Sequence, residues 1–139
     1  MKKIIITLLF IFILVGCKAQ PHEISTAIEF DKIIAKSVVR YDLRTYEECS
    51  NGHIPGFLCI DNGDLSPVEQ AIYNITNKYS NYKKSDIIVL ISKNTIDAQE
   101  AASQLAKKGF KNIYYFRGGY DEYVNQKGDD FEPEVGCDC

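Results

Sequence analysis

Apolar residues along the chain occur either in short continuous runs or at helical spacing. Residues 87–91 are five apolar residues in a row and predict a buried strand. In the segment that follows, alanine and leucine recur on one helix face up to Gly109, a suitable C-cap. A strand that enters a helix through a short polar loop can present free N–H groups to an anion. The loop, residues 92–97, is therefore the first candidate site.

The same two patterns predict elements on both sides of this loop. Helices are expected over residues 26–36, 65–79 and 120–125, with a single helical turn over 46–50. Strands are expected over residues 38–41, 57–60 and 113–116. Strands that alternate with helices on short connections imply an α/β fold with a mainly parallel sheet covered on both faces. Sites in such sheets lie at the carboxyl ends of strands, where Asp42, Arg44 and residues 92–97 fall.

The first segment has the layout of a secretory signal, with Lys2 and Lys3 before an apolar run that is too short for a comfortable membrane span. The run ends in four residues that resemble the lipobox of bacterial lipoproteins: Leu14, Val15, Gly16 and Cys17. The resemblance implies a signal peptide over residues 1–16, lipid attachment at Cys17 and a tether over 17–23. An ordinary cleaved signal and an uncleaved anchor are the alternatives. Lys18 replaces the aspartate associated with inner-membrane retention, so the outer membrane of the cell envelope is favoured, on either face.

Length and charge limit the partners. The chain has 16 basic and 19 acidic residues, and without Lys2 and Lys3 its net formal charge is about −5. This balance argues against nucleic acid and provides no polybasic membrane patch. From Cys17 onward the chain suffices for one domain with a core. We expect membrane contact through the lipid, an unknown protein or small-ligand partner, and no cofactor.

Two motifs around the loop resemble the rhodanese-like domain family. Asp42 and Arg44 come before a pentapeptide that looks like the family's first signature: Gly52, His53, Ile54, Pro55 and Gly56. A second segment, from Gly109 through Gly118 and Gly119 to the aromatic Tyr123, is similar to the family's closing segment. The resemblance covers residues 24–126 and implies a central sheet of about five strands with helices on both faces. Residues 127–139 are then a polar C-terminal tail.

The loop keeps the family's frame but not its chemistry. The family carries a Cys directly after the strand, which accepts a sulfane sulfur and passes it on. Aligned without a gap, Ser92 takes that position, Thr95 takes that of a glycine and Asp97 that of an arginine. A Ser hydroxyl forms no persulfide, and Asp97 places an anion beside an anion cradle. We therefore expect no catalytic residue in the degenerate loop, which comprises Ser92, Lys93, Asn94, Thr95, Ile96 and Asp97, and a binding or scaffold module.

Cysteines elsewhere leave alternatives open. Cys49 and Cys59 are expected to be buried or half-buried thiols, although a disulfide is possible if their Cα atoms come within about 7 Å. Cys137 and Cys139 could pair, bind a soft metal ion or receive sulfur, but two thiols are only part of a metal site, so none is predicted. The alternatives are a sulfurtransferase or thiol-exchange enzyme using Cys59 or the Cys137/Cys139 pair, and a metal- or redox-handling tail.

Other polar residues of the motifs have structural explanations. His53 is expected to hydrogen bond within its turn. Asp42 and Arg44 are expected to fix a strand end through an ion pair and backbone hydrogen bonds. A cluster of tyrosines near the end of the predicted sheet should belong mostly to the core.

Overall fold

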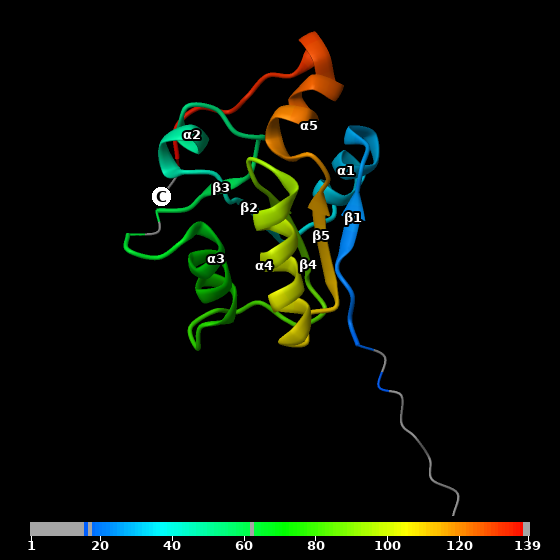
Figure 1. The fold of residues 1–139 in the computed structure, drawn as a ribbon, viewed down its shortest axis with the longest axis vertical. Helices are drawn as coiled ribbons and strands as arrows, with labels where there is room; N and C mark the ends of the chain where they lie inside the picture. Colours follow the sequence, from blue (N-terminus) through cyan, green and yellow to red (C-terminus); the bar gives the residue numbers. More distant parts are fainter. Residues whose placement is uncertain (1–15, 17, 62, 138–139) are drawn as a thin grey trace, which may run out of the picture.

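The computed structural model describes residues 16, 18–61 and 63–137. It has a central sheet with helices on both faces (Figure 1). Most of the expected signal peptide, the expected lipid site Cys17, and Cys139 lie outside the described residues. Within the described part, no helix has the length and apolar character needed to cross a membrane.

The sheet has five strands, all parallel, in the order β1-β5-β4-β2-β3. The strands are β1 (His22–Ile24), β2 (Val39–Asp42), β3 (Leu58–Cys59), β4 (Ile87–Ile91) and β5 (Asn112–Phe116). This arrangement confirms the expected α/β fold with a parallel sheet. All the carboxyl ends therefore lie at one edge of the sheet.

The first strand lies in a segment that the sequence assigned to the tether. His22 and Glu23 form part of β1, which pairs with β5 at the edge of the sheet. The ring of His22 stacks on Tyr114 with centroids 4.8 Å apart, and Arg117 forms an ion pair with Glu23. A strand of three residues with only Ile24 buried has too little hydrophobic alternation to be recognised from sequence.

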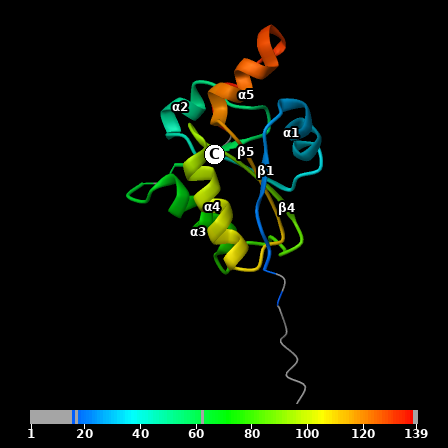
Figure 2. The same cartoon turned by 45° about the vertical axis from the view of Figure 1, so that its right-hand side comes forward.

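Helices cover the sheet in two layers (Figures 1 and 2). The helices α3 and α4 pack on one face, whereas α1 and α5 pack on the other. They are α1 (Ala27–Ile34), α2 (Tyr46–Ser50), α3 (Pro67–Thr76), α4 (Thr95–Lys107) and α5 (Gly119–Lys127), followed by the 3₁₀ turn η1 (Gly128–Asp130). The helix expected over 65–79 is shorter because Ser66 caps it at Pro67.

Strand β4 is the centre of the core. Ile88 and Leu90 belong to the cluster that includes α3 and α4 residues, whereas Val89 and Ile91 belong to the cluster that includes α1 and α5 residues. All four side chains are fully buried. Alternate residues of a strand point to opposite faces, so a continuous apolar run fits a sheet covered on both sides.

Candidate functional site

Three of the sequence motifs meet at the carboxyl edge of the sheet. Asp42 ends β2, Ser92 follows β4 directly, and Gly118 comes two residues after the end of β5. The parallel register places these three strand ends side by side. The edge therefore combines the first signature, the degenerate loop and the closing segment.

Asp42 and Arg44 form a buried ion pair. The Asp42 carboxylate, which has no exposed surface, accepts from Arg44 Nη2 at 2.7 Å and from Nε at 3.0 and 3.1 Å. It also accepts the Arg44 backbone N–H at 3.0 Å. Such a fork fixes the geometry of both groups, and burial makes either charge costly without the other.

Arg44 also connects the strand end to two other segments. Its Nη2 donates to the Gly52 carbonyl at 2.6 Å, which ties β2 to the turn after α2. Its guanidinium carbon lies 3.4 Å from the centroid of the Tyr120 ring at the start of α5. Burial is the main cause that raises the pKa of Tyr120. These contacts hold the Arg44 guanidinium between the strand end, the turn after α2 and the Tyr120 ring.

The Ser92 loop is closed by its own side chains. The Ser92 hydroxyl is fully buried, accepts the Ala98 N–H at 3.1 Å and donates to the Asn94 carbonyl. Asn94 is the N-cap of α4, and its side-chain oxygen accepts the Ile96 N–H at 2.9 Å. Two amide groups at this helix start, those of Ile96 and Ala98, are thus bonded to side chains of the loop itself. The helix already begins at Thr95, so only three residues separate it from β4.

The closing segment packs directly on this loop. The Gly118 N–H donates to Thr95 Oγ1 at 2.8 Å, and the Tyr120 N–H donates to the Ser92 carbonyl at 2.8 Å. A Cβ atom on Gly119, whose φ is +78°, would lie 2.3 Å from the Lys93 carbonyl oxygen. Only glycine permits this approach of two backbones. Thr95 itself does not adopt a positive φ, so its side chain is compatible with the loop.

The mouth of the loop carries an exposed ion pair. Lys93 Nζ binds the Glu48 carboxylate at 2.5 Å, which lowers the pKa of Glu48 and raises that of Lys93. Ile96 beside it is 67% exposed, and Asp97 is half-buried in the first turn of α4. Neither histidine is placed to activate Ser92, since the His22 ring stacks on Tyr114 and His53 Nδ1 hydrogen bonds the Cys49 carbonyl. The loop presents a cation, an anion and an apolar side chain to solvent.

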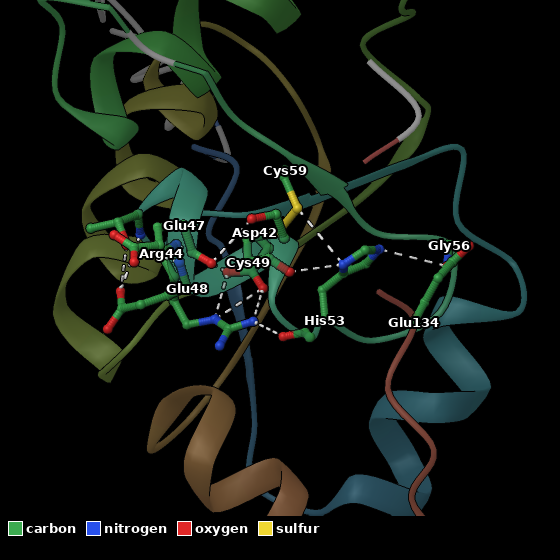
Figure 3. The surroundings of a disulfide bond; sticks show 12 residues. Asp42, Arg44, Glu47, Glu48, Cys49, His53, Gly56, Cys59 and Glu134 are labelled. Carbon is green, nitrogen blue, oxygen red and sulfur yellow. Dashed lines mark hydrogen bonds and ion pairs between the residues drawn. A yellow bond between two sulfur atoms is a disulfide. The ribbon is translucent and has the colours of Figure 1, made fainter. Parts of the chain in front are cut away.

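A disulfide joins Cys49 to Cys59 and links α2 to β3 (Figure 3). The two Cα atoms are 5.6 Å apart, within the range that a disulfide requires. The expectation that both residues are thiols is therefore wrong, and the disulfide that the sequence left possible is the one that forms. Their separation of ten residues gave no signal, because only the parallel pairing of β3 with β2 brings them together.

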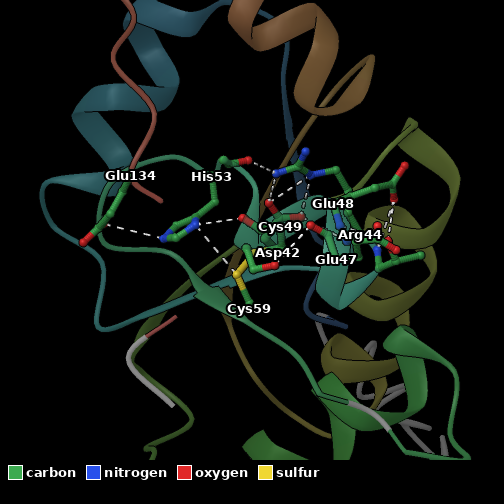
Figure 4. Close-up of polar contacts among 11 residues, drawn as sticks. Asp42, Arg44, Glu47, Glu48, Cys49, His53, Cys59 and Glu134 are labelled. Carbon is green, nitrogen blue, oxygen red and sulfur yellow. Dashed lines mark hydrogen bonds and ion pairs between the residues drawn. A yellow bond between two sulfur atoms is a disulfide. The ribbon is translucent and has the colours of Figure 1, made fainter. Parts of the chain in front are cut away.

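His53 lies beside this disulfide (Figure 4). Its Nδ1 is 2.9 Å from the Cys49 carbonyl oxygen and 3.7 Å from Cys59 Sγ, and its Nε2 is 3.6 Å from a Glu134 carboxylate oxygen. Donor atoms of His53 and both cysteines lie within 4.8 Å of one another. Sulfurs joined in a disulfide carry no thiolate charge, so in this state the three residues offer no metal-ligand set.

The segment after η1 docks beside His53. Glu134 exchanges backbone hydrogen bonds with His53 at 2.9 and 3.0 Å, and Gly136 donates to the Ser50 carbonyl at 2.8 Å. A Glu134 carboxylate oxygen accepts the Gly56 N–H at 2.8 Å. These contacts bring Cys137 into a cleft of about 490 Å³ that is also lined by Cys59 and His53. The polar composition of residues 127–139 did not reveal this docking.

Comparison with known proteins agrees with the fold and the motifs. The family described as Rhodanese-like domain matches residues 26–126, most of the chain. The chain belongs to this family.

A curated relative is the tRNA uridine(34) hydroxylase of Buchnera aphidicola subsp. Baizongia pistaciae (strain Bp), 28% identical over 89 residues. The match covers 64% of this chain but only 27% of that protein, so the chain spans about a quarter of its curated relative.

Solved structures show the same fold. The rhodanese-like domain of the Alr3790 protein from Anabaena sp. has a TM-score of 0.62 at 18% identity, over 80% of this chain and 77% of that one. The thiosulfate sulfurtransferase from Pseudomonas aeruginosa has a TM-score of 0.61 at 15% identity, over 86% of this chain and 20% of that one. At such identities the likeness concerns the fold alone.

Proposed function

We propose that this chain is a lipid-anchored rhodanese-like domain of the cell envelope that does not transfer sulfur through its active-site loop. It serves as a binding or scaffold module for a protein or small ligand at the carboxyl edge of the sheet. Cys17 is the lipid attachment site.

The state of Ser92 is the observation that carries the loss of sulfur transfer. Its buried hydroxyl donates to the Asn94 carbonyl and accepts the Ala98 N–H, so it stabilises the loop from inside. Sulfur transfer needs a thiolate that can reach an incoming sulfur, and a buried hydroxyl in these bonds offers neither acidity nor access. The amide groups of Ile96 and Ala98 are bonded to the loop's own side chains, which reduces the affinity for an anionic sulfur donor.

The Cys49–Cys59 disulfide supports a position outside the cytoplasm. Disulfides persist in oxidising compartments such as the periplasm and are rare in the cytosol. Lipid attachment at Cys17 agrees with such a position, because several acyl chains hold a domain stably at a membrane surface.

A thiosulfate:cyanide sulfurtransferase assay on the full chain in detergent tests the missing activity. We expect background thiocyanate formation and no persulfide by mass spectrometry. The variant Ser92→Cys should gain little over the matched control Ser92→Ala, because the Asn94 cap and Asp97 remain. Turnover by the wild-type chain, or robust turnover by Ser92→Cys, would overturn the proposal.

Membrane fractionation of cells tests the anchor. The wild-type chain should sediment with membranes and carry acyl chains detectable by mass spectrometry. The variant Cys17→Ser should carry none and leave the membrane fraction, whereas the control Cys139→Ser should behave as wild type. Acylation that persists in Cys17→Ser would contradict the assignment.

A further inference from the structure

Three cysteines lie around β3: a disulfide-bonded pair ten residues apart, and a third in the docked tail that lines the same cleft as Cys59. Cys49 belongs to α2, Cys59 ends β3, and Cys137 belongs to the docked tail. Cys59 and Cys137 line the same cleft, whereas Cys49 lies behind them with no exposed surface. The disulfide thus has one buried sulfur and one that faces a cleft holding another cysteine.

The docked tail accounts for this proximity. Two backbone hydrogen bonds between Glu134 and His53, and a third from Gly136 to Ser50, fix the segment immediately before Cys137. The tail also passes over Gly52, where an added Cβ would lie 3.3 Å from Pro133 Cβ. Cys137 therefore follows directly on a chain segment bonded to the residues around the disulfide.

We propose that Cys49, Cys59 and Cys137 form a thiol–disulfide exchange centre in which Cys59 changes its partner from Cys49 to Cys137. The Cys137 thiolate attacks Cys59 Sγ, a Cys59–Cys137 bond forms, and the Cys49–Cys59 bond breaks. Cys49 leaves as a thiolate and takes up the proton that Cys137 has lost. The number of disulfides is unchanged, so the step needs no oxidant or reductant.

Exposure determines which sulfur is attacked. Cys59 is half-buried in the cleft, whereas Cys49 is completely buried. Exchange requires an approach to the attacked sulfur and is favoured when the leaving thiolate is stabilised. Cys59 Sγ is the sulfur that an incoming thiolate can approach, so Cys49 becomes the leaving group.

His53 lies beside the sulfur that is attacked, Cys59 Sγ. A carbonyl oxygen only accepts hydrogen bonds, so the 2.9 Å contact with the Cys49 carbonyl places a proton on Nδ1. This N–H group lies 3.7 Å from Cys59 Sγ, and donor atoms of His53 and both cysteines lie within 4.8 Å of one another. Glu134 holds the other side of the ring.

The exchange would convert a noncovalent contact into a covalent one. A Cys59–Cys137 bond would lock the tail over the cleft and release the Cys49 thiol inside the domain. Whether the tail is covalently bound would then depend on the ratio of thiols to disulfides in the compartment. Small or protein thiols and disulfides are the substrates of this centre.

Tryptic mass spectrometry distinguishes the two disulfides, because Cys49 and Cys59 lie in one peptide, residues 45–78, and Cys137 lies in another, residues 128–139. The experiment uses the full chain in detergent with the substitutions Cys17→Ser and Cys139→Ser. Cys137 is then the only cysteine of the tail peptide, so any cross-link to that peptide involves Cys137. We then add Cys49→Ser and incubate the protein in a glutathione redox buffer. We expect a cross-link between the two peptides in monomeric protein.

The matched control replaces Cys59→Ser in the same background and leaves the buried Cys49. A thiol held in the same cleft acts at an effective concentration on the order of millimolar, so the Cys49→Ser protein should cross-link at least about tenfold more than the control. Separate alkylation of Cys59 and Cys137 in folded Cys49→Ser protein, or equal cross-linking in the control, would overturn the proposal.

If the Cys49→Ser protein does not fold, the deciding measurement uses the Cys17→Ser, Cys139→Ser chain, which retains Cys49, Cys59 and Cys137. In a partly reducing glutathione buffer quenched with acid, a fraction of molecules should carry the cross-link between the peptides while one disulfide per chain is retained. Finding only the disulfide within residues 45–78 at every buffer ratio would overturn the exchange.

Discussion

Ser92 shows how one small polar side chain stabilises a strand-to-helix loop from inside. Its hydroxyl bonds both the Asn94 carbonyl and the Ala98 N–H, across the point where the chain changes from β4 to α4. In an N-cap such a bond satisfies an amide that the helix itself leaves open. The serine on which the proposed loss of sulfur transfer rests thus also stabilises the fold.

The variant Ser92→Ala should lower the free energy of unfolding by about 1–2 kcal/mol, because buried hydrogen-bonding groups lose their partner. Urea unfolding followed by circular dichroism measures this. The control Ser103→Ala, within α4 and away from the loop, should be neutral or slightly stabilising, because alanine is the better helix former. Equal effects at both positions would contradict the role of the Ser92 hydroxyl.

Arg44→Ala should be more damaging than loss of any surface charge. It leaves the fully buried Asp42 carboxylate without its partner, and breaking a buried pair in this way costs about 3–5 kcal/mol. The comparison is Lys93→Ala, which removes a solvent-exposed ion pair with Glu48 and should change the urea midpoint far less. Similar midpoints for the two variants would show that Asp42 tolerates the loss.

At the scale of elements, the β5–α5 turn gives a structural reason for the two adjacent glycines of this chain. Gly118 and Gly119 have φ values of +88° and +78°, and they allow the turn to lie against the backbone of the Ser92 loop. The hydrogen bonds from Gly118 and Tyr120 to that loop depend on this approach. The turn and the loop thus form one packed unit.

Gly119→Ala should destabilise the protein by more than about 2 kcal/mol, because the new Cβ meets a backbone oxygen as well as an unfavourable φ. Gly128→Ala is the matched control, since Gly128 also has a positive φ but has open space where a Cβ would lie. It should cost only about 1 kcal/mol. Thermal unfolding of both variants separates the clash from the strain, and equal losses would argue against the clash.

The elements differ in how well the sequence predicted them. Strand β4 is a continuous apolar run because it is buried on both faces, and helix α4 has clear helical periodicity because one of its faces is buried. By contrast, β1 has three residues and β3 has two, and their pairing with β5 and β2 defines them more than their composition does. Short edge strands depend on partners far away in the chain, which a local pattern does not contain.

At the scale of the whole molecule, the disulfide and the tail complete one side of the domain. Cys49–Cys59 links α2 to the edge strand β3, and the tail covers the turn that contains His53. The edge strand therefore gains a covalent bond on one side and a docked segment beside it. Protection of exposed sheet edges is a general need of β structure.

Replacing both cysteines, Cys49→Ala with Cys59→Ala, should cost about 2–3 kcal/mol, from the loop entropy that a crosslink of this separation removes in the unfolded chain. Urea unfolding of the wild-type chain should shift similarly when dithiothreitol is added. The double variant should not respond to dithiothreitol, and a response there would assign the stabilisation to another bond.

The sequence by itself determined the family and the parallel α/β fold, and its resemblance to the family is the basis for proposing that Ser92 replaces the nucleophile. Those features depend on local information: runs and periodicity that define buried strands and helices, motifs of fixed spacing, and the residue at position 92. The expected lipid attachment at Cys17 also comes from a local motif, although it lies outside the described residues.

Only the tertiary structure decided the disulfide, the edge strand β1 and the cleft that holds Cys137. Each depends on contacts between segments that local sequence patterns do not relate. Two cysteines ten residues apart become partners because β3 pairs with β2, and the tail meets them through backbone hydrogen bonds that carry no residue signature. Backbone pairing is nearly independent of side-chain identity, which is why the sequence did not reveal these contacts.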